Sequence, residues 1–477
     1  MAPPEARPLL PKEKIDSSYK AMRWRVFIGV FIGYAAFYLV RKNASFAIPG
    51  MIKDGILADT SQAGLAMAGI PVAYAMSKFL MGSVSDRSDA RKFLTLGLLL
   101  TSAVMILTGL LPFGLWAPSF NVVMLFVLMF LAGWFSGMGW PPCGRVMVHW
   151  FSQNERSFKI SVWNTAHNVG AGTLGLLVTA GMAIAAWLLG GTPDADGYVS
   201  GTWNAAFIFP SLVAVLIAAF CWWAVRDTPE SCGLPSVSDW RNDHSGIKSR
   251  IAQEENIPFK TLFVECIFKN KLLWLIGTGN AFVYLLRYGI GDWAPTYLTQ
   301  SNLMSLGEAN TAFAIYEYAA IPGTILCGLV SSKFFKGRCA PPNIIFMTLT
   351  MLGVLIYWKA PQIAVSFASD PASVAALTKT IIYIGLFCVG FFIYGPIAMV
   401  GVQALNLVPK GAAGTAAGFM SVFGYLIGDA VLSKIVLSNI KDASGWSATF
   451  AFCMVAGLIA IAFLGSTWKR EKALTEA

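Results

Sequence analysis

The feature that most constrains this chain is a series of about twelve apolar runs, each near the ~20 residues that a helix needs to cross a bilayer. Only 13% of its 477 residues are charged, against roughly 25% in a soluble domain. Hydrocarbon offers no partner to backbone polar groups, so spans of this kind must be helices. The sequence therefore predicts an all-α membrane protein with twelve transmembrane helices. The runs lie near residues 25–49, 62–85, 93–112, 121–142, 158–188, 203–224, 271–298, 309–332, 342–359, 377–400, 411–436 and 446–468.

The longest polar segment separates the sixth run from the seventh and divides the runs into two sets of six. The first run is too long for the apolar region of a signal peptide, so we expect it to be retained as a helix. The expected parts are an N-terminal tail (1–24), an N-terminal half (25–225), a linker (226–270), a C-terminal half (271–468) and a C-terminal tail (469–477).

Lysine and arginine are distributed unevenly over the polar segments. They cluster before the first run, after the second, in the linker, after the eighth run and after the twelfth, whereas the alternate loops are nearly bare. By the positive-inside rule, both termini and the linker should be cytoplasmic.

Two loops carry related patterns. The first copy follows the second run and consists of Gly82, Asp86, Arg87 and Arg91. A degraded copy occupies 328–338, with Ser332 where an aspartate is expected, so we expect it to latch less firmly. The pattern resembles the loop signature of the major facilitator superfamily, which implies two pseudo-symmetric six-helix halves.

Two arginines stand deep in apolar runs at matching places. Tyr38 and Arg41 lie about sixteen residues into the first run, and Tyr284 and Arg287 repeat this arrangement in the seventh. A charge at the centre of a membrane helix costs about 2.5–3.5 kcal/mol. Snorkelling to an interface is the alternative, but both arginines lie far from the basic ends of their runs. We therefore expect one site between the halves, where two guanidinium forks hold a dianion such as phosphate.

The residues around the first arginine are expected to continue one helix. Tyr34, Tyr38 and Arg41 then share a face, because they stand at positions i, i+4 and i+7, and Lys42 lies beside that face.

A second polar face is expected in the fifth run, where Asn164, His167 and Asn168 recur at helical spacing. An imidazole can donate to a phosphate oxygen and titrates near neutral pH. The alternative is a buried histidine that is only satisfied by its neighbours.

Three further ionisable residues lie inside apolar runs, namely Lys78, Asp292 and Glu317. Counted together, four core cations (with Arg41, Lys42 and Arg287) face two carboxylates. The surplus of two positive charges would attract a dianion. These groups could instead only neutralise one another and hold helices together. Tyr394 and Tyr425 could line the same cavity or belong to the aromatic belt of the membrane interface.

Seven segments carry a more specific resemblance, at 33–43, 137–145, 163–170, 226–235, 282–290, 316–324 and 412–419. They resemble the organophosphate:phosphate antiporter family of the major facilitator superfamily. The resemblance implies a multi-pass protein of the bacterial inner membrane that takes up glycerol 3-phosphate and releases inorganic phosphate by alternating access. It also implies uptake of the phosphonate fosfomycin.

The resemblance assigns roles to individual residues. It implies that Arg41, Arg287 and His167 contact phosphate, and that Lys42–Asp292 and His167–Glu317 are pairs between the halves that rearrange with substrate. The residues implied to line the cavity are Lys78, Tyr38, Asn164, Tyr284, Tyr394 and Tyr425.

Substrate choice is less firmly indicated. Hexose-phosphate members of the family are expected to have an Asp/Lys pair in the eleventh run, and residues 418–422 have neither charge, which favours glycerol 3-phosphate. Transport of a hexose phosphate or phosphoglycerate, a proton-coupled symport of another anion, and a non-transporting organophosphate sensor remain alternatives. We expect no enzyme activity, cofactor, metal or nucleic-acid partner, and a monomer in the lipid bilayer.

The two-arginine site predicts that Arg41→Lys or Arg287→Lys abolishes phosphate exchange while the protein still inserts. Charge is kept, but the bidentate fork is lost. Exchange by each purified variant in proteoliposomes measures this, and near-normal transport in either would refute the site.

Overall fold

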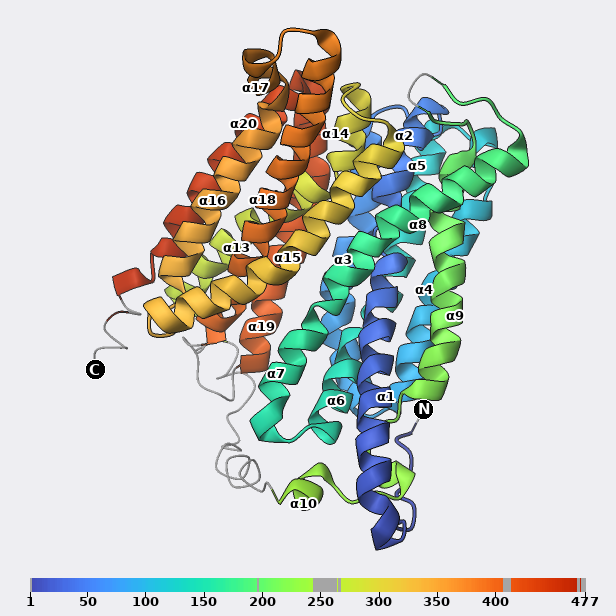
Figure 1. Ribbon diagram of the computed structural model, residues 1–477, viewed down its shortest axis with the longest axis vertical. Coiled ribbons are helices and arrows are strands. Elements are labelled where there is room, and N and C mark those ends of the chain that lie inside the picture. Colours follow the sequence, from blue (N-terminus) through green and yellow to red (C-terminus); the bar gives the residue numbers. More distant parts are fainter. Residues whose placement is uncertain are drawn as a thin grey trace.

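The computed structural model describes residues 2–194, 197–242, 264, 267–405, 413–469 and 472, and these form helices without a strand. Most of the expected linker beyond residue 242 and nearly all of the C-terminal tail lie outside the described residues. Figure 1 shows one bundle in which long helices run in roughly the same direction.

The described part of the first half contains nine α-helices, several of which are halves of one membrane pass. They are α1 (Lys12–Leu39), α2 (Asn43–Lys53), α3 (Thr60–Asp86), α4 (Ala90–Leu110), α5 (Pro118–Ser136), α6 (Trp140–Trp150), α7 (Gln153–Asn164), α8 (Ala166–Leu189) and α9 (Ala205–Ala224). A short helix, α10 (Val237–Arg241), follows in the linker.

The second half is built in the same way. Its helices are α13 (Lys271–Gly291), α14 (Ala294–Gln300), α15 (Leu306–Phe334), α16 (Ala340–Trp358), α17 (Ala360–Phe367), α18 (Pro371–Leu405), α19 (Ala413–Ser421), the π-helix η6 (Val422–Val436) and α20 (Leu437–Gly465).

Twelve passes can be traced through the described residues. Nine helical stretches are long and apolar enough to cross a membrane. One of them, Ala416–Gly465, bends at Gly445 (φ 78°) and so contains two passes. Two further long helices complete the set. They are α3, which packs against α5, and α13, which packs against η6.

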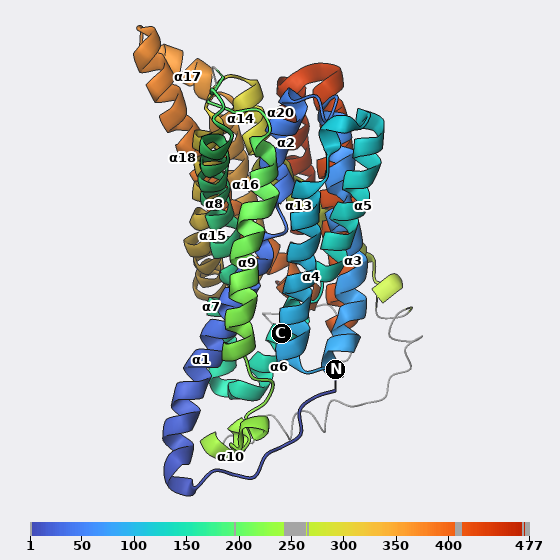
Figure 2. The same ribbon diagram turned by 90° about the vertical axis from the view of Figure 1, so that its right-hand side faces the viewer.

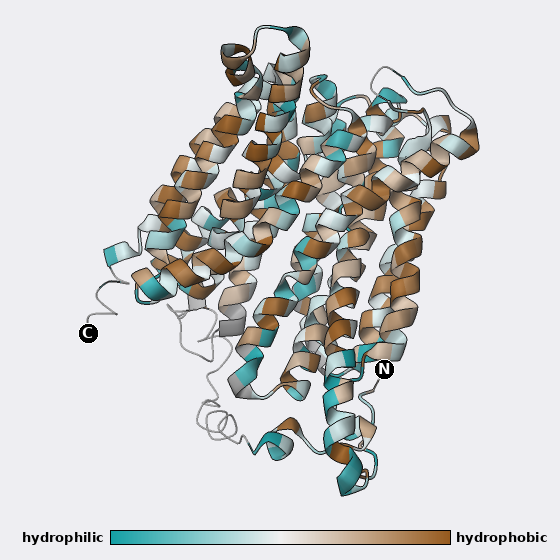
Figure 3. Ribbon diagram, in the orientation of Figure 1, coloured by the Kyte–Doolittle hydropathy of each residue, from teal (hydrophilic) through white to brown (hydrophobic). Residues whose placement is uncertain are grey.

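Hydrophobic residues cover the long helices, whereas hydrophilic ones gather toward both ends of the bundle (Figure 3). This is the pattern that a bilayer selects, because its hydrocarbon core excludes unpaired polar groups. Figure 2, turned by 90°, shows α1 extending below the other helices, next to α10. The rings of Tyr19 and Trp240 stack there at 4.2 Å, so the start of the linker packs on α1.

The first pass is not one continuous helix, and the expectation of a single helix through Arg41 is wrong. α1 ends at Leu39 and α2 begins at Asn43, so Arg41 and Lys42 lie in the break. The seventh pass also breaks, but a few residues beyond its arginine: Arg287 lies within α13, and the break falls between Gly291 and Ala294. Such irregular backbone is tolerated at membrane depth where protein surrounds it, as the burial of residues 36–51 indicates.

The two halves meet at the end of the bundle that contains α2 and α14, which is the upper end in Figure 1. α2 contacts α14, α8 contacts α15, and α3 contacts both η6 and α20. Gly64 of α3 permits the approach to η6, because a Cβ there would collide with the carbonyl oxygen of Lys434. The helices therefore come within backbone contact across the two halves.

Candidate functional site

Arg41 lies at the break of the first pass and is 7% exposed. Its guanidinium carbon sits 3.5 Å from the ring centroid of Tyr74, 5.2 Å from that of Tyr38 and 5.8 Å from that of Tyr425. The face of an aromatic ring carries partial negative charge, so these rings stabilise the cation without neutralising it.

Arg287 of α13 has a similar surrounding and is 4% exposed. Its guanidinium carbon lies 4.5 Å from the ring centroid of Tyr394 and 4.7 Å from that of Tyr288, and the Tyr284 ring is 5.8 Å away. Its Nε is buried without a hydrogen-bond partner among the described residues. A strong donor in such a position is open to an acceptor from a ligand.

The two arginines are connected through aromatic rings contributed by both halves. The Tyr425 ring lies 4.9 Å from Tyr74 of the first half and 5.2 Å from Tyr284 of the second. We call these rings the tyrosine cage, with members Tyr38, Tyr74, Tyr284, Tyr288, Tyr394 and Tyr425. The cage surrounds both guanidinium groups at the junction of the halves.

The buried lysines differ from the arginines in having carboxylate partners. Lys42 Nζ lies 2.8 Å from an Asp292 oxygen and 3.4 Å from a Glu317 oxygen, across the two halves. Lys434 Nζ lies 2.6 Å from the other Asp292 oxygen and 3.5 Å from Asp429. Among the described residues, no carboxylate forms an ion pair with Arg41 or Arg287. The site therefore contains two paired cations and two cations without an acid.

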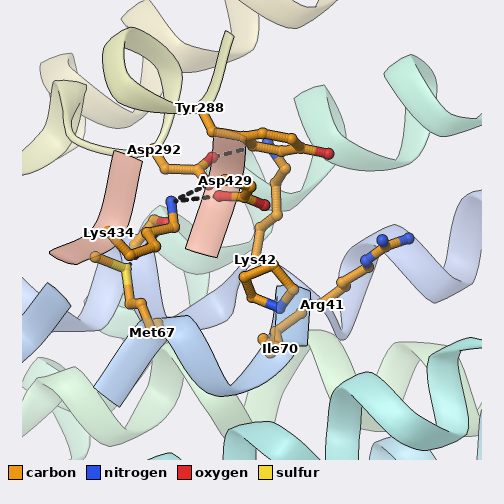
Figure 4. Close-up of a pocket in the computed structure, with 11 residues that line it drawn as sticks. Arg41, Lys42, Met67, Ile70, Tyr288, Asp292, Asp429 and Lys434 are labelled. Carbon is orange, nitrogen blue, oxygen red and sulfur yellow. Dashed lines mark hydrogen bonds and ion pairs between the residues drawn. The ribbon is translucent and has the colours of Figure 1, made fainter. Parts of the chain in front are cut away.

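Figure 4 shows how these residues point. Lys42, Asp292, Asp429 and Lys434 converge on one cluster, whereas Arg41 points away from it. A small cavity of about 30 Å³ lies beside the cluster. This volume holds a water molecule but no organophosphate, so the cluster closes this side of the site.

Asp429 and Lys434 are site residues that the sequence analysis missed. In an α-helix, residues five apart are separated by about 140° around the axis, so this pair would not share a face. η6 is a π-helix, whose i→i+5 hydrogen bonds place residues five apart one above the other. An aspartate and a lysine inside one apolar run were the signal that could have found them.

The two residues also weaken the argument against a hexose phosphate. Residues 418–422 are uncharged, as the sequence says, but an Asp/Lys pair stands further along the same pass, inside the site. The charge balance is unaltered, because one cation and one carboxylate are added. Five cations, with half-buried Lys78 included, now face three carboxylates.

Glu317 joins the site differently from the expected pair with His167. Its carboxylate accepts hydrogen bonds from Tyr394 Oη at 2.6 Å and from Asn168 Nδ2 at 3.0 Å. His167 instead contacts the carbonyl oxygen of Asn164 through Nδ1. In this conformation the partner of Glu317 on α8 is therefore Asn168, the residue that follows His167. A His167–Glu317 pair would require the two side chains to rearrange.

His167 nevertheless borders the tyrosine cage. Its ring centroid lies 5.5 Å from that of Tyr38 and 5.8 Å from that of Tyr394. Lys78 is half-buried, with Nζ 5.7 Å from the Tyr425 ring centroid. Of the residues expected to line the cavity, Tyr38, Tyr284, Tyr394 and Tyr425 are cage members, and Lys78 borders the cage. The loop residues Gly82, Asp86, Arg87 and Arg91 lie at the end of α3 and the start of α4. The side chain of Asp86 lies outside the described residues.

A second set of contacts joins the halves beyond the cluster. Asp442 of α20 accepts hydrogen bonds from the backbone and side chain of Ser61, both at 2.6 Å, and from Thr60. α3 begins at Thr60 and already has its own N-cap, Asp59, which accepts from Gln62 N at 2.8 Å. A carboxylate from one half thus adds a second cap to a helix of the other.

Comparison with known proteins gives this arrangement its context. Residues 30–433 match the family model described as Major Facilitator Superfamily. This chain belongs to the major facilitator superfamily. Among superfamily members, the glycerol-3-phosphate transporter of Bacillus subtilis is 43% identical over 463 residues, covering 97% of this chain and 96% of that protein.

Two other relatives bear on the superfamily fold and on its range of functions. The membrane sensor protein UhpC of Escherichia coli is 32% identical, with 98% of each chain covered. A bacterial homologue of the human lysosomal transporter Spinster, in an inward-facing and unoccupied conformation, superposes with a TM-score of 0.68. That alignment has 16% identity and covers 94% of this chain and 98% of the other, so it speaks to the fold alone.

The lysine–carboxylate cluster predicts a specific pattern of stabilities. Lys434→Met should leave Asp429 buried without its cation and cost about 3–5 kcal/mol, whereas Asp429→Asn in addition should restore part of the loss, because Asp292 keeps Lys42. Thermal unfolding in detergent measures both. Lys379→Met is the matched control, because its pair with Glu308 is about one-third exposed and should contribute little. A double variant no more stable than Lys434→Met would contradict the pairing.

Proposed function

We propose that this protein is a secondary antiporter that exchanges external glycerol 3-phosphate for internal inorganic phosphate. The observation that carries the proposal is a pair of buried arginines, one from each half, that form no ion pair with a carboxylate among the described residues, whereas the buried Lys42 and Lys434 do. An oxyanion would supply the missing charge, and the guanidinium fork matches phosphate in geometry. The similarity to a glycerol-3-phosphate transporter supports glycerol 3-phosphate as the organic substrate.

Phosphate binding would join the halves through charge. Without a ligand, Arg41 and Arg287 repel each other across the junction in a medium of low dielectric. A dianion held between them replaces that repulsion by attraction and lowers the barrier to rocking of the halves. An empty site resists this movement, which makes exchange the favoured reaction and leak the disfavoured one. The outward gradient of phosphate then drives uptake.

The cluster around Asp292 would act as the gate on the α2–α14 side. Lys42 reaches Asp292 from the first half, and Lys434 reaches it from the second. When the halves separate on this side, Lys42 must leave a buried carboxylate. Lys434 moves with Asp292 and keeps it paired, so that separation does not strand a buried anion.

The remaining features of the proposal concern the setting of the transporter. Both termini lie on the cytoplasmic side of the bacterial inner membrane, with tails and linker as bounded by the sequence pattern, and the monomer is sufficient because each chain contributes both arginines. Fosfomycin, a phosphonate, would enter by the same site. His167, Asn164 and Lys78 would contact the substrate from the edge of the tyrosine cage.

Two alternatives have specific support. Asp429 and Lys434 inside the site favour testing a hexose phosphate as the organic substrate. The similarity to a membrane sensor protein favours testing binding without transport.

The deciding experiment loads proteoliposomes with labelled phosphate and adds external substrate without a pH gradient. Efflux driven by glycerol 3-phosphate supports antiport, and greater efflux with glucose 6-phosphate would transfer the proposal to hexose phosphates. Binding without any efflux would contradict antiport and support a sensor.

Alternating access makes a separate prediction for Asp442. Asp442→Asn should weaken the contact with the start of α3, so the α2–α14 side opens more often. A cysteine at Ser45, which lines the small cavity, should then react faster with a membrane-impermeant thiol reagent, measured against the chain without that cysteine. Asp59→Asn is the matched control, because Asp59 caps the same helix from within its own half. Equal acceleration in both variants would contradict a latch between the halves.

A further inference from the structure

A group of arginines lies at the opposite end of the first half, where α1, α4 and α9 come together. α1 and α9 approach closely there, because a Cβ on Gly29 would lie 2.9 Å from the Cβ of Ala224. α4 contacts both helices. Figures 1 and 2 both show the lower ends of the three helices side by side, on the side where the chain begins.

The cations in this group are packed on two tryptophans that follow each other in α9. The Arg91 guanidinium carbon lies 4.6 Å from the ring centroid of Trp222, and that of Arg25 lies 5.2 Å from the ring centroid of Trp223. Arg226 follows α9 directly and donates to the carbonyl oxygens of Val225 at 2.7 Å and Trp223 at 2.9 Å. Three guanidinium groups from three elements thus converge on one helix end.

The described residues place no carboxylate in an ion pair with these three arginines. Asp227, the nearest acid in sequence, is bound instead by Arg145 at 2.9 and 3.0 Å and by the backbone N–H of Ala90 at 3.1 Å. Burial lowers the pKa of Arg226 from its ordinary value, and the positive charges of Arg25 and Arg91 lower it further. The group is therefore an uncompensated concentration of positive charge.

Arg25 has donors that nothing in the described chain satisfies. Its Nε and Nη2 are shielded from solvent and have no hydrogen-bond partner there. A guanidinium donor in such a position loses its hydration without regaining a bond, which is costly unless a further acceptor is present. An oxyanion placed against Arg25 would supply the acceptor and the charge together.

The surroundings indicate where that anion comes from. Trp222 is 48% exposed and Trp223 is 56% exposed, at the end of a membrane-spanning helix. Tryptophans in such positions lie at the level of lipid headgroups. Basic side chains at that level attract anionic lipids, and basic pockets between transmembrane helices bind their headgroups.

We infer that Arg25, Arg91 and Arg226 form a binding site for the phosphodiester headgroup of an anionic phospholipid, with Trp222 and Trp223 packed along its upper acyl chain. The site is distinct from the junction of the halves, and it does not depend on which substrate is exchanged. A bound lipid would neutralise the three cations and join the ends of α1, α4 and α9.

Native mass spectrometry of the purified full chain, titrated with phosphatidylglycerol or phosphatidylcholine in detergent, tests this site. Wild type should retain phosphatidylglycerol in preference to phosphatidylcholine. Arg25→Gln should lower its apparent affinity about fivefold, since one basic side chain contributes about 1 kcal/mol to binding of anionic lipid. Lys92→Gln is a matched control at an exposed position beside Arg91 and should reduce the affinity less than Arg25→Gln, because the Lys92 ammonium stays hydrated whereas the Arg25 donors are shielded.

A second variant and a competing ligand complete the experiment. If Arg25→Gln does not fold, Arg91→Gln removes a cation from another helix and should give a similar loss. Inorganic phosphate should not displace the lipid, and displacement would identify free phosphate as the ligand. Equal retention of the two lipids by wild type, or equal losses in Arg25→Gln and Lys92→Gln, would overturn the proposal.

Discussion

Burial of positive charge without an acid is the constraint on which the rest of this structure depends. Arg41 and Arg287 are 7% and 4% exposed, and an unpaired ion in that environment is expensive. Aromatic faces offset part of the cost, since each guanidinium lies over several tyrosine rings. In the proposed function, an anion that arrives from outside the chain offsets the remainder. The two arginines are therefore the residues on which the proposed oxyanion site rests.

The neighbouring lysines show the contrasting solution. Lys42 and Lys434 share the two oxygens of Asp292, and each has a second carboxylate nearby. Because Lys42 comes from the other half, Asp292 joins the two halves and also neutralises the buried lysines. A buried ion pair adds little net stability but is costly to break on one side. It is suited to a contact that must open only when charge is supplied elsewhere.

The sequence predicted the membrane spans well, because these depend on local composition. It failed where the backbone departs from a regular α-helix. Periodicity placed Arg41 on a continuous helical face, but the chain breaks between Leu39 and Asn43. The same assumption hid Asp429 and Lys434, which only a π-helix brings onto one face. Long-range partners came only through the family resemblance, which implied the Lys42–Asp292 pair that the structure contains but gave Glu317 to His167 and not to Asn168.

The sequence by itself determined that this chain crosses a membrane about twelve times and that its core carries more positive than negative charge. The first property follows from the transfer free energy that each apolar segment has on its own. The second follows from the charged residues that those segments contain. Only the tertiary structure decided which cations are paired and which are free, because ion pairing depends on distances between residues up to 275 positions apart. That division between paired lysines and arginines without an acid is the observation on which the proposed oxyanion site rests, and no local pattern contains it.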